Sequence, residues 1–140
     1  MSVDAIATRA LQRLSTLGAL RQVDAEFATL LQLRLTAAPA VALAGALAMR
    51  AVALGHSGFA LAQASALLAE LETDVALPAT QDWSQALHES DCVAAHADGD
   101  GSTPLVFEQG RVALQRYARY EHDLATRLLQ RAAMPASTVD

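Results

Sequence analysis

Three side chains able to bind a transition metal recur at four-residue spacing in the second half of the chain. His88, Cys92 and His96 would share one face of the helix that the hydrophobic pattern predicts over residues 83–96. Positions spaced this way spread over about 12 Å along a helix, however, which is too far for one ion to contact all three side chains. A small metal-binding helical protein is therefore one hypothesis, with this spacing against it.

An Asp-Gly-Asp-Gly run at residues 98–101 invites comparison with a calcium-binding EF-hand loop. Such a loop needs Gly at its sixth position and Glu at its twelfth. Those positions are occupied here by Thr103 and Gln109. The pattern fails, and the run predicts a solvated loop.

The basic residues exclude several classes of enzyme. All ten are Arg, and the chain contains no Lys. It therefore has no Walker A lysine for ATP hydrolysis, no Schiff-base lysine and no Ser-Lys pair. Nothing in the sequence marks a nucleophile elbow either. We predict no catalytic residue, no metal ligand and no cofactor-binding residue in these 140 residues.

The charges are distributed unevenly along the chain. Residues 1–50 carry a balance of +2, residues 51–110 carry −9 and residues 111–140 carry +2. The acidic middle repels phosphate, which argues against free-standing DNA binding. A nucleic-acid-binding module remains the alternative hypothesis, because Tyr117 and Tyr120, with Arg111, Arg116 and Arg119, could stack on bases.

Length and composition indicate one soluble domain. The chain has 140 residues, 53% of them hydrophobic, and much of that fraction is Ala, which favours helices. No apolar run reaches the roughly 18 residues of a membrane span, and the charged N-terminus does not resemble a signal peptide. The single cysteine fits a reducing compartment, so we expect a cytoplasmic protein.

The hydrophobic pattern predicts a mainly α fold, a compact bundle of about five or six helices with one small antiparallel β-hairpin near residues 104–115. Predicted helices cover residues 3–17, 39–54, 62–72, 83–96 and 116–131. Another begins with Asp24 as its N-cap and presents Phe27, Leu30, Leu31 and Leu35 on its apolar face.

Glycines and one apolar helix add detail to this prediction. Gly18 and Gly55 are expected to stop the helices that precede them. The helix over residues 39–54 is apolar nearly all round, so it should be buried. Residues 56–61 are interpreted as a short extended link, and Gln109-Gly110 as the tight turn of the hairpin.

Four segments in a fixed order resemble the N-terminal region of RecD, the alpha subunit of exodeoxyribonuclease V (the RecBCD enzyme). The family pattern opens with Leu-Arg-Pro-Leu-Asp-x-x-Phe, continues with a helix that leads to Gly-His, and then has a Trp-containing stretch. It closes with Pro-Leu-Val-Leu-x-Gly-x-Arg-Leu-Tyr-Leu-x-Arg-Tyr-Trp-x-Tyr-Glu. The matching residues are Leu20, Arg21, Asp24, Phe27, Pro39, Leu43, Ala44, Ala46, Leu47, Gly55, His56, Trp83, Pro104, Leu105, Val106, Gly110, Arg111, Leu114, Arg116, Tyr117, Tyr120 and Glu121.

The resemblance implies a role in assembly rather than catalysis. It implies that residues 1–131 dock a helicase subunit onto RecC, and that the subunit meets RecB through the complex. Residues 132–140 would then be a linker toward an ATPase region that is absent here. The whole subunit would be an ATP- and Mg-dependent 5′-to-3′ DNA helicase acting in double-strand-break repair. It would meet DNA through the complex. Ala113 and Ala118 stand where relatives have Tyr and Trp.

The partner interface that we expect on this basis comprises Trp83, Leu105, Phe107, Arg111, Arg116, Tyr117 and Tyr120.

Overall fold

The computed structural model describes residues 2–96 and 103–116. In chain order its elements are α1 (Val3–Thr16), α2 (Gln22–Arg34), α3 (Pro39–Ala53), β1 (Gly58–Ala60), the 3₁₀-helix η1 (Leu61–Leu68), α4 (Thr80–His88), β2 (Val93–Ala94), β3 (Leu105–Glu108) and β4 (Arg111–Leu114). The mainly helical class is confirmed. The predicted helix over residues 116–131 lies almost entirely outside the described residues.

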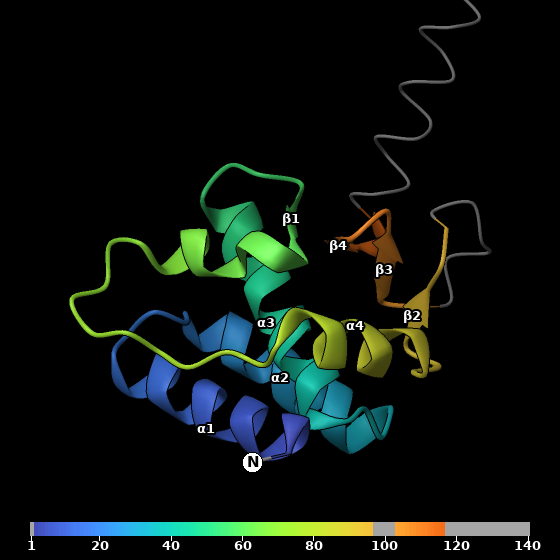
Figure 1. The fold of residues 1–140 in the computed structure, drawn as a ribbon, viewed down its shortest axis with the longest axis horizontal. Helices are drawn as coiled ribbons and strands as arrows, with labels where there is room; N and C mark the ends of the chain where they lie inside the picture. The colour runs from blue at the N-terminus through green and yellow to red at the C-terminus, as the bar shows by residue number, and fades with distance from the viewer. Residues whose placement is uncertain (1, 97–102, 117–140) are drawn as a thin grey trace, which may run out of the picture.

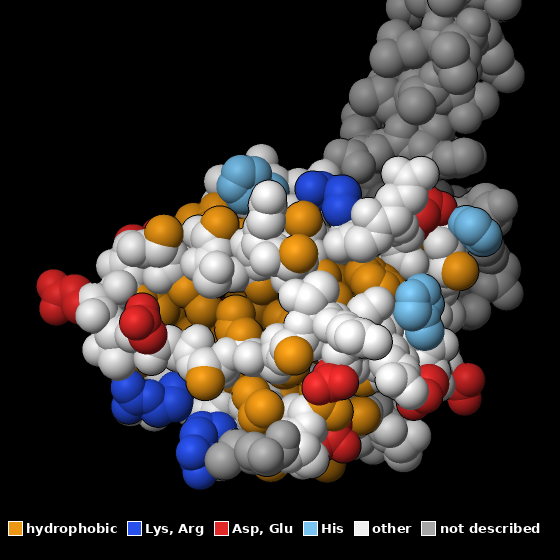
Figure 2. Space-filling model, viewed as in Figure 1, with side chains coloured by type: hydrophobic (Ala, Val, Ile, Leu, Met, Phe, Trp, Pro, Cys, Tyr) orange, Lys and Arg blue, Asp and Glu red, His pale blue; other side chains and the backbone are white. Residues whose placement is uncertain are grey.

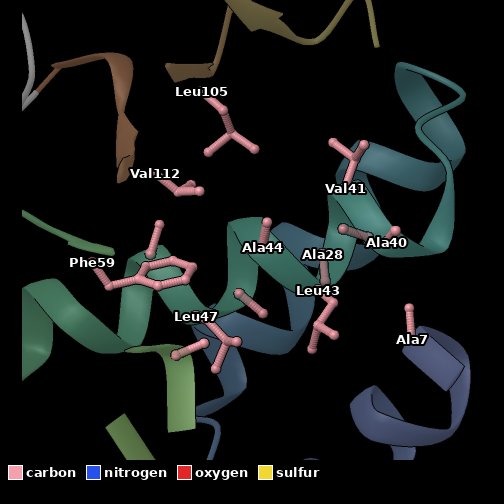
Figure 3. Packing of buried hydrophobic residues seen from close by; sticks show 14 of the residues in the cluster. Ala7, Ala28, Ala40, Val41, Leu43, Ala44, Leu47, Phe59, Leu105 and Val112 are labelled. Atoms are coloured by element: carbon pink, nitrogen blue, oxygen red, sulfur yellow. The ribbon is translucent and has the colours of Figure 1, made fainter. Parts of the chain in front are cut away.

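Helix α3 forms the centre of the molecule, as its apolar sequence predicted. Residues 40–48 and Ala51 are all buried. Helices α1, α2 and α4, the 3₁₀-helix η1 and strands β1 and β4 all pack against it, and Figure 1 shows α1 and α2 on one side of it and the sheet on the other. Figure 3 shows Leu43 and Leu47 of α3 in the same core as Phe59, Leu105 and Val112 from the strands. Burial of these side chains stabilises the fold by about 25 cal/mol per Å² of apolar surface removed from water.

A glycine allows α2 to approach α3 closely. A Cβ atom added at Gly45 would lie 2.6 Å from Cδ1 of Leu31 and 3.1 Å from Cε2 of Phe27. Leu31 is itself fully buried, so its side chain has little room to move. The α2–α3 contact therefore depends on the absence of a side chain at this position.

Valine in place of Gly45 is expected to destabilise the domain by about 1–3 kcal/mol, because an overpacked core forces side chains out of their rotamers. The loss should appear as a lower urea midpoint with an unchanged m-value. Valine at exposed Ala53, on the same helix, serves as the control and should change the midpoint little. Equal stability of the Gly45→Val variant and the wild type would contradict a tight α2–α3 contact.

Helices α1 and α3 end as their glycines predicted. Gly18 and Gly55 have φ values of +73° and +94°, which glycine adopts without steric cost. After α3, the backbone N–H of His56 donates to the carbonyl of Ala51 at 2.9 Å. A corresponding bond follows α1, so both ends are Schellman motifs.

The predicted start of α2 was wrong by a few residues. The N-cap is Arg21, and Asp24 lies in the first turn of the helix. The carboxylate of Asp24 accepts the backbone N–H of Arg21 at 3.0 Å. It thus satisfies a donor at the helix start from a position three residues later, as the acidic residue of a capping box does.

The predicted apolar face of α2 was also wrong in part. Asp24, Ala28 and Leu31 are buried, whereas Leu30 is 49% exposed and Leu35 is 46% exposed. The predicted positions Phe27, Leu30, Leu31 and Leu35 extend around more of the circumference of α2 than α3 covers. Helix α2 therefore keeps apolar side chains on its solvent side.

The predicted β-hairpin is confirmed, but it is part of a larger sheet. Strands β3 and β4 pair antiparallel around Gln109 and Gly110, whose positive φ values of 54° and 75° fit a type I′ turn. Strand β1 pairs antiparallel with β4, and β2 pairs parallel with β3, giving the order β1-β4-β3-β2. The prediction of a single hairpin was therefore incomplete, and residues 58–60 of the predicted extended link form an edge strand of this sheet.

Two predicted helices differ in the structure. The predicted helix over residues 83–96 starts at Thr80 and ends at His88, and residues 93–94 pair with β3. The backbone N–H of Leu105 donates to the carbonyl of Cys92 at 3.3 Å, so sheet pairing replaces helical bonds there. The predicted helix over residues 62–72 is the 3₁₀-helix η1, which is kinked at Gln63.

Candidate functional site

The residues predicted to contact a partner fall into three groups. Trp83, Leu105 and Phe107 are buried, with exposures of 1%, 0% and 6%. Arg111 and Arg116 are exposed on and beside β4. Tyr117 and Tyr120 lie outside the described residues. Of the five members that the structure describes, the three apolar ones are therefore buried and the two arginines are exposed.

Trp83 joins α4 to the central helix. Its indole Nε1–H donates to the carbonyl of Ala40 at 2.9 Å, and its ring lies 6.4 Å from that of Phe59, centroid to centroid. A buried indole N–H needs such a partner. Trp83 thus connects α4, the first turn of α3 and strand β1 in one contact.

The proposed metal triad does not assemble in the structure. Helix α4 ends at His88, whose ring packs 5.1 Å from the ring of Phe107. Cys92 is buried with its Sγ atom 3.6 Å from the carbonyl oxygen of Leu35. His96 has its Nδ1 atom 3.0 Å from Oε2 of Glu108. The three side chains therefore have separate surroundings.

Within residues 2–96 and 103–116, no group of three His, Cys, Asp or Glu side chains is arranged to hold a metal ion. The Asp-Gly-Asp-Gly run at 98–101 lies outside the described residues.

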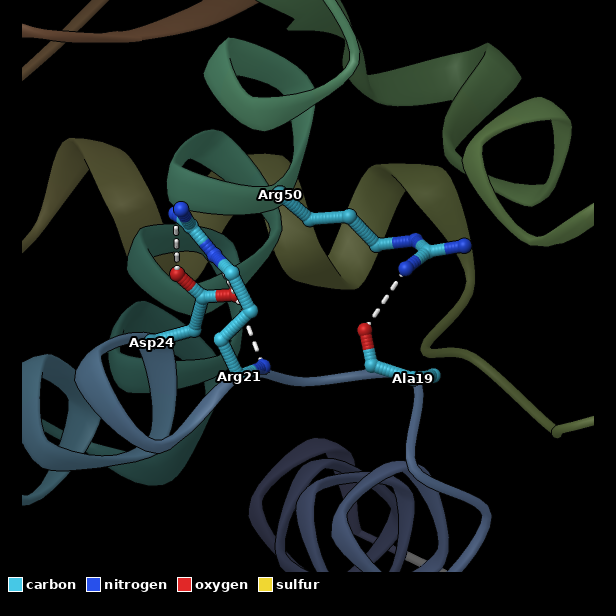
Figure 4. A network of polar contacts seen from close by, with 4 residues as sticks. All are labelled: Ala19, Arg21, Asp24 and Arg50. Carbon is cyan, nitrogen blue, oxygen red and sulfur yellow. Dashed lines mark hydrogen bonds and ion pairs between the residues drawn. The ribbon is translucent and has the colours of Figure 1, made fainter.

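Arg50 is a central polar residue that the sequence reading did not single out. Its side chain is 11% exposed. Its Nε donates to the carbonyl of Leu67 at 2.8 Å, and an Nη donates to the carbonyl of Ala19 at 2.6 Å. The other Nη pairs with the carboxylate of Glu70. Figure 4 shows Arg50 reaching from α3 to Ala19, between α1 and α2. Its sequence signal was the single cation in an otherwise apolar helix.

Asp24 and Arg21 form a second polar pair near the start of α2. Asp24 is 1% exposed, and its two carboxylate oxygens accept bonds from the Arg21 guanidinium at 2.8 and 3.2 Å. This hydrogen bond, and then the charge of Asp24, raise the pKa of Arg21 above its usual value. Both residues belong to the first segment of the family pattern, and they shape the α1–α2 connection (Figure 4).

Two surface features could contact another molecule. A cavity of about 530 Å³ lies where α2, α3 and the hairpin meet, lined by Phe27, Met49, Thr103, Pro104, Leu114, Gln115 and Arg116. Separately, the solvent side of α2 exposes Leu30 and Leu33, the latter by 75%.

Hydrophobic side chains also gather in the middle of the face shown in Figure 2, and the Arg side chains seen there are separated rather than continuous. This face does not offer the basic stripe typical of nucleic-acid binding. Among the described residues, no helix has both the length and the apolar character to cross a membrane.

A comparison with known families found a match for this chain. The model of the RecBCD enzyme subunit RecD, N-terminal domain, matches residues 16–112. No curated protein matches the chain. The matched range begins at the end of α1 and reaches into β4, so it includes the Arg21–Asp24 pair, the buried helix α3, Trp83 and most of the sheet. By this match over more than half of its length, the chain belongs to the RecD N-terminal domain family of the RecBCD enzyme.

Proposed function

We propose that this domain docks a RecD helicase subunit onto RecC within the RecBCD enzyme and performs no catalysis itself. The observation that carries the proposal is the family match over residues 16–112. RecD is a subunit of a multiprotein enzyme, and a compact domain in such a subunit has other subunits as natural partners. The proposal places the protein in the cytoplasm, where the assembled enzyme would act on DNA.

The chemistry of the chain supports an assembly role. The sequence has no Lys, so it cannot provide a Walker A lysine to the phosphates of ATP. In this proposal ATP and Mg belong to a helicase region that follows residues 132–140 in the full subunit. Residues 1–131 contribute the domain whose surface meets RecC.

The fold supports a location for this RecC-binding surface at the hairpin and just after β4. Arg111 is exposed at the hairpin turn, opposite Glu108 in the register, and Arg116 is exposed just after β4. Trp83, Leu105 and Phe107 hold the sheet and α4 in place beneath it. We propose that Tyr117 and Tyr120 extend this surface.

We expect the purified chain to bind RecC from the same source, with saturation at one domain per RecC. Isothermal titration calorimetry measures this directly, and the burial of apolar surface should give a negative heat-capacity change. A thermally unfolded sample serves as the control.

Fluorescence anisotropy with single-stranded DNA separates this role from the nucleic-acid alternative. We expect no binding of the isolated chain to DNA. DNA binding that weakens steeply with salt, together with no RecC binding, would contradict the assembly role and support a nucleic-acid-binding module.

A further inference from the structure

Helix α2 and its C-cap carry most of the large apolar side chains that are exposed in the described part of the chain. Val23, Leu30, Leu33 and Leu35 are between 46% and 75% exposed, and Leu54 is the one other such residue among those described. The exposed positions of α1 and α4 hold polar or charged side chains or Ala instead. Large apolar side chains that gather on one surface mark a contact with another molecule, whereas single exposed ones need no explanation.

Three of these residues share one face of α2, outside its buried face. At 100° per residue, Val23, Leu30 and Leu33 fall within about 80° of one another around the helix. Leu30 and Leu33 also line a surface hollow of about 410 Å³, and every residue that lines this hollow belongs to α2. The hollow is therefore a surface that a single helix presents to solvent.

Two opposite charges flank this face at equal distances from Leu30. Glu26 precedes Leu30 by four residues and Arg34 follows it by four, and both are exposed and line the same hollow. Within the described residues the side chain of Arg34 has no hydrogen bond or ion pair, and that of Glu26 accepts only from Nε2 of Gln22, at 3.0 Å. Glu26 and Arg34 lie about 12 Å apart along the helix, too far to pair with each other.

We propose that this face of α2 pairs with the same face of a second copy of the chain, with the two helices antiparallel about a twofold axis at Leu30. In such an isologous contact the same patch serves on both copies. Leu30 then packs against Leu30 of the second copy, with Leu33 beside it. Because Glu26 and Arg34 are equally far from Leu30, each Glu26 meets Arg34 of the other copy, and two ion pairs flank the apolar contact.

The charge pattern favours an antiparallel second copy over other occupants. In a parallel pairing Glu26 would face Glu26 and Arg34 would face Arg34, and like charges across an interface are unfavourable. One acid and one base give this face no net charge, so neither a phosphate backbone nor an anionic lipid surface is favoured. A different protein would have to supply an acid and a base at the matching spacing, which a second copy supplies by itself.

The size of the face sets the strength of the contact. A helix of 13 residues is about 20 Å long. Its face therefore buries less than the roughly 800 Å² per partner of a typical stable complex, which makes the dimer weak and reversible. We expect the purified chain to be a monomer at about 10 µM and to dimerise as its concentration approaches about 1 mM. Sedimentation velocity across this range measures the change.

A substitution at the twofold axis tests the apolar contact. Leu30→Ser should raise the dissociation constant of the dimer about tenfold or more, because both copies lose the central side chain. Leu54→Ser is the matched control: Leu54 is also a large exposed apolar residue, at 44%, but lies at the end of α3. This variant should dimerise as the wild type does. Both should melt near the wild-type temperature by circular dichroism, since the replaced side chains are exposed.

Exchanging the charges tests the antiparallel register. Glu26→Arg leaves cations at both positions, and Arg34→Glu leaves carboxylates at both, so each variant alone should dimerise about tenfold more weakly at low salt. Mixed in equal amounts, the two variants should form a dimer with each other, because every charge then meets an opposite one. The double variant, with both substitutions in one chain, should dimerise as the wild type does.

The outcomes are read on the purified chain alone, so they do not depend on the proposed binding to RecC. A wild-type dimer that Leu30→Ser weakens, together with pairing in the mixture of the two charge variants, supports the antiparallel contact. A wild-type chain that stays monomeric at about 1 mM overturns it. So does a dimer that Leu30→Ser leaves unchanged, or a mixture of the charge variants that associates no better than either variant alone.

Discussion

Replacing Trp83 by Ala is expected to lower the free energy of unfolding by about 3–5 kcal/mol, the range for deleting a large buried aromatic side chain. Trp83 is 1% exposed and contacts both the Ala40 carbonyl and the ring of Phe59. A typical domain is stable by only about 5–15 kcal/mol, so the variant should be close to unfolding. Because Trp83 is the single Trp of the chain, denaturation should be followed by far-UV circular dichroism rather than by fluorescence.

Trp83→Phe separates the hydrogen bond from the packing. Phe keeps an aromatic ring but has no N–H for the carbonyl of Ala40. We expect a loss clearly smaller than that of Trp83→Ala, about 1–2 kcal/mol for the missing bond and the smaller ring. A loss below about 1 kcal/mol for Trp83→Ala would contradict the central packing role. Binding to RecC should weaken only as far as the domain unfolds, because the indole is buried.

Replacing Arg50 by Ala is expected to destabilise the domain by about 2–4 kcal/mol, because bonds to a buried charged group are worth more than neutral ones. The guanidinium bonds two backbone carbonyls, of Ala19 and Leu67, and pairs with Glu70. Each carbonyl would lose the partner that Arg50 provides. Hydrogen exchange should show faster exchange around residues 19–20 and 67–71 than elsewhere, since Arg50 connects these segments to α3.

Matched variants at Arg50 and Glu70 separate the causes of this loss of stability. Arg50→Met keeps an apolar stem and isolates the polar contribution. Arg50→Lys keeps the charge but not the planar fork, so most of the loss should remain. Glu70→Gln should cost only about 0–1 kcal/mol, because Glu70 is 62% exposed and surface ion pairs contribute little. Full recovery in Arg50→Lys would show that charge alone, rather than guanidinium geometry, holds the two carbonyls.

Local signals in the sequence predicted much of the helical half of the molecule. These signals are Pro39 in the first turn of α3, Gly18 and Gly55 after the ends of α1 and α3, and the apolar surface all round α3. Each depends on backbone geometry or hydrophobicity, which are properties of short segments. The hairpin was also predicted from a local signal. Two segments with alternating apolar and polar residues are joined by Gln109 and Gly110, and both of these residues adopt the positive φ that a tight turn requires. The ordered residues of the four family segments also predicted the family that the comparison then showed.

Contacts between distant segments decided the rest. Residues 93–94 leave the predicted helix because β3 provides backbone partners about a dozen positions later, and residues 58–60 become a strand because β4 does. Packing between elements decided which residues are buried, Trp83 and Leu105 among them. It also decided that His88, Cys92 and His96 lie apart, and which two backbone carbonyls Arg50 can reach. The cavity beside Gln115 arises only where α2, α3 and the hairpin meet. The sequence by itself therefore determined helices α1 and α3, the turn and the family, because these follow from local chemistry. The tertiary structure alone decided the sheet and the candidate site, because both are made by residues that become neighbours only in the folded chain.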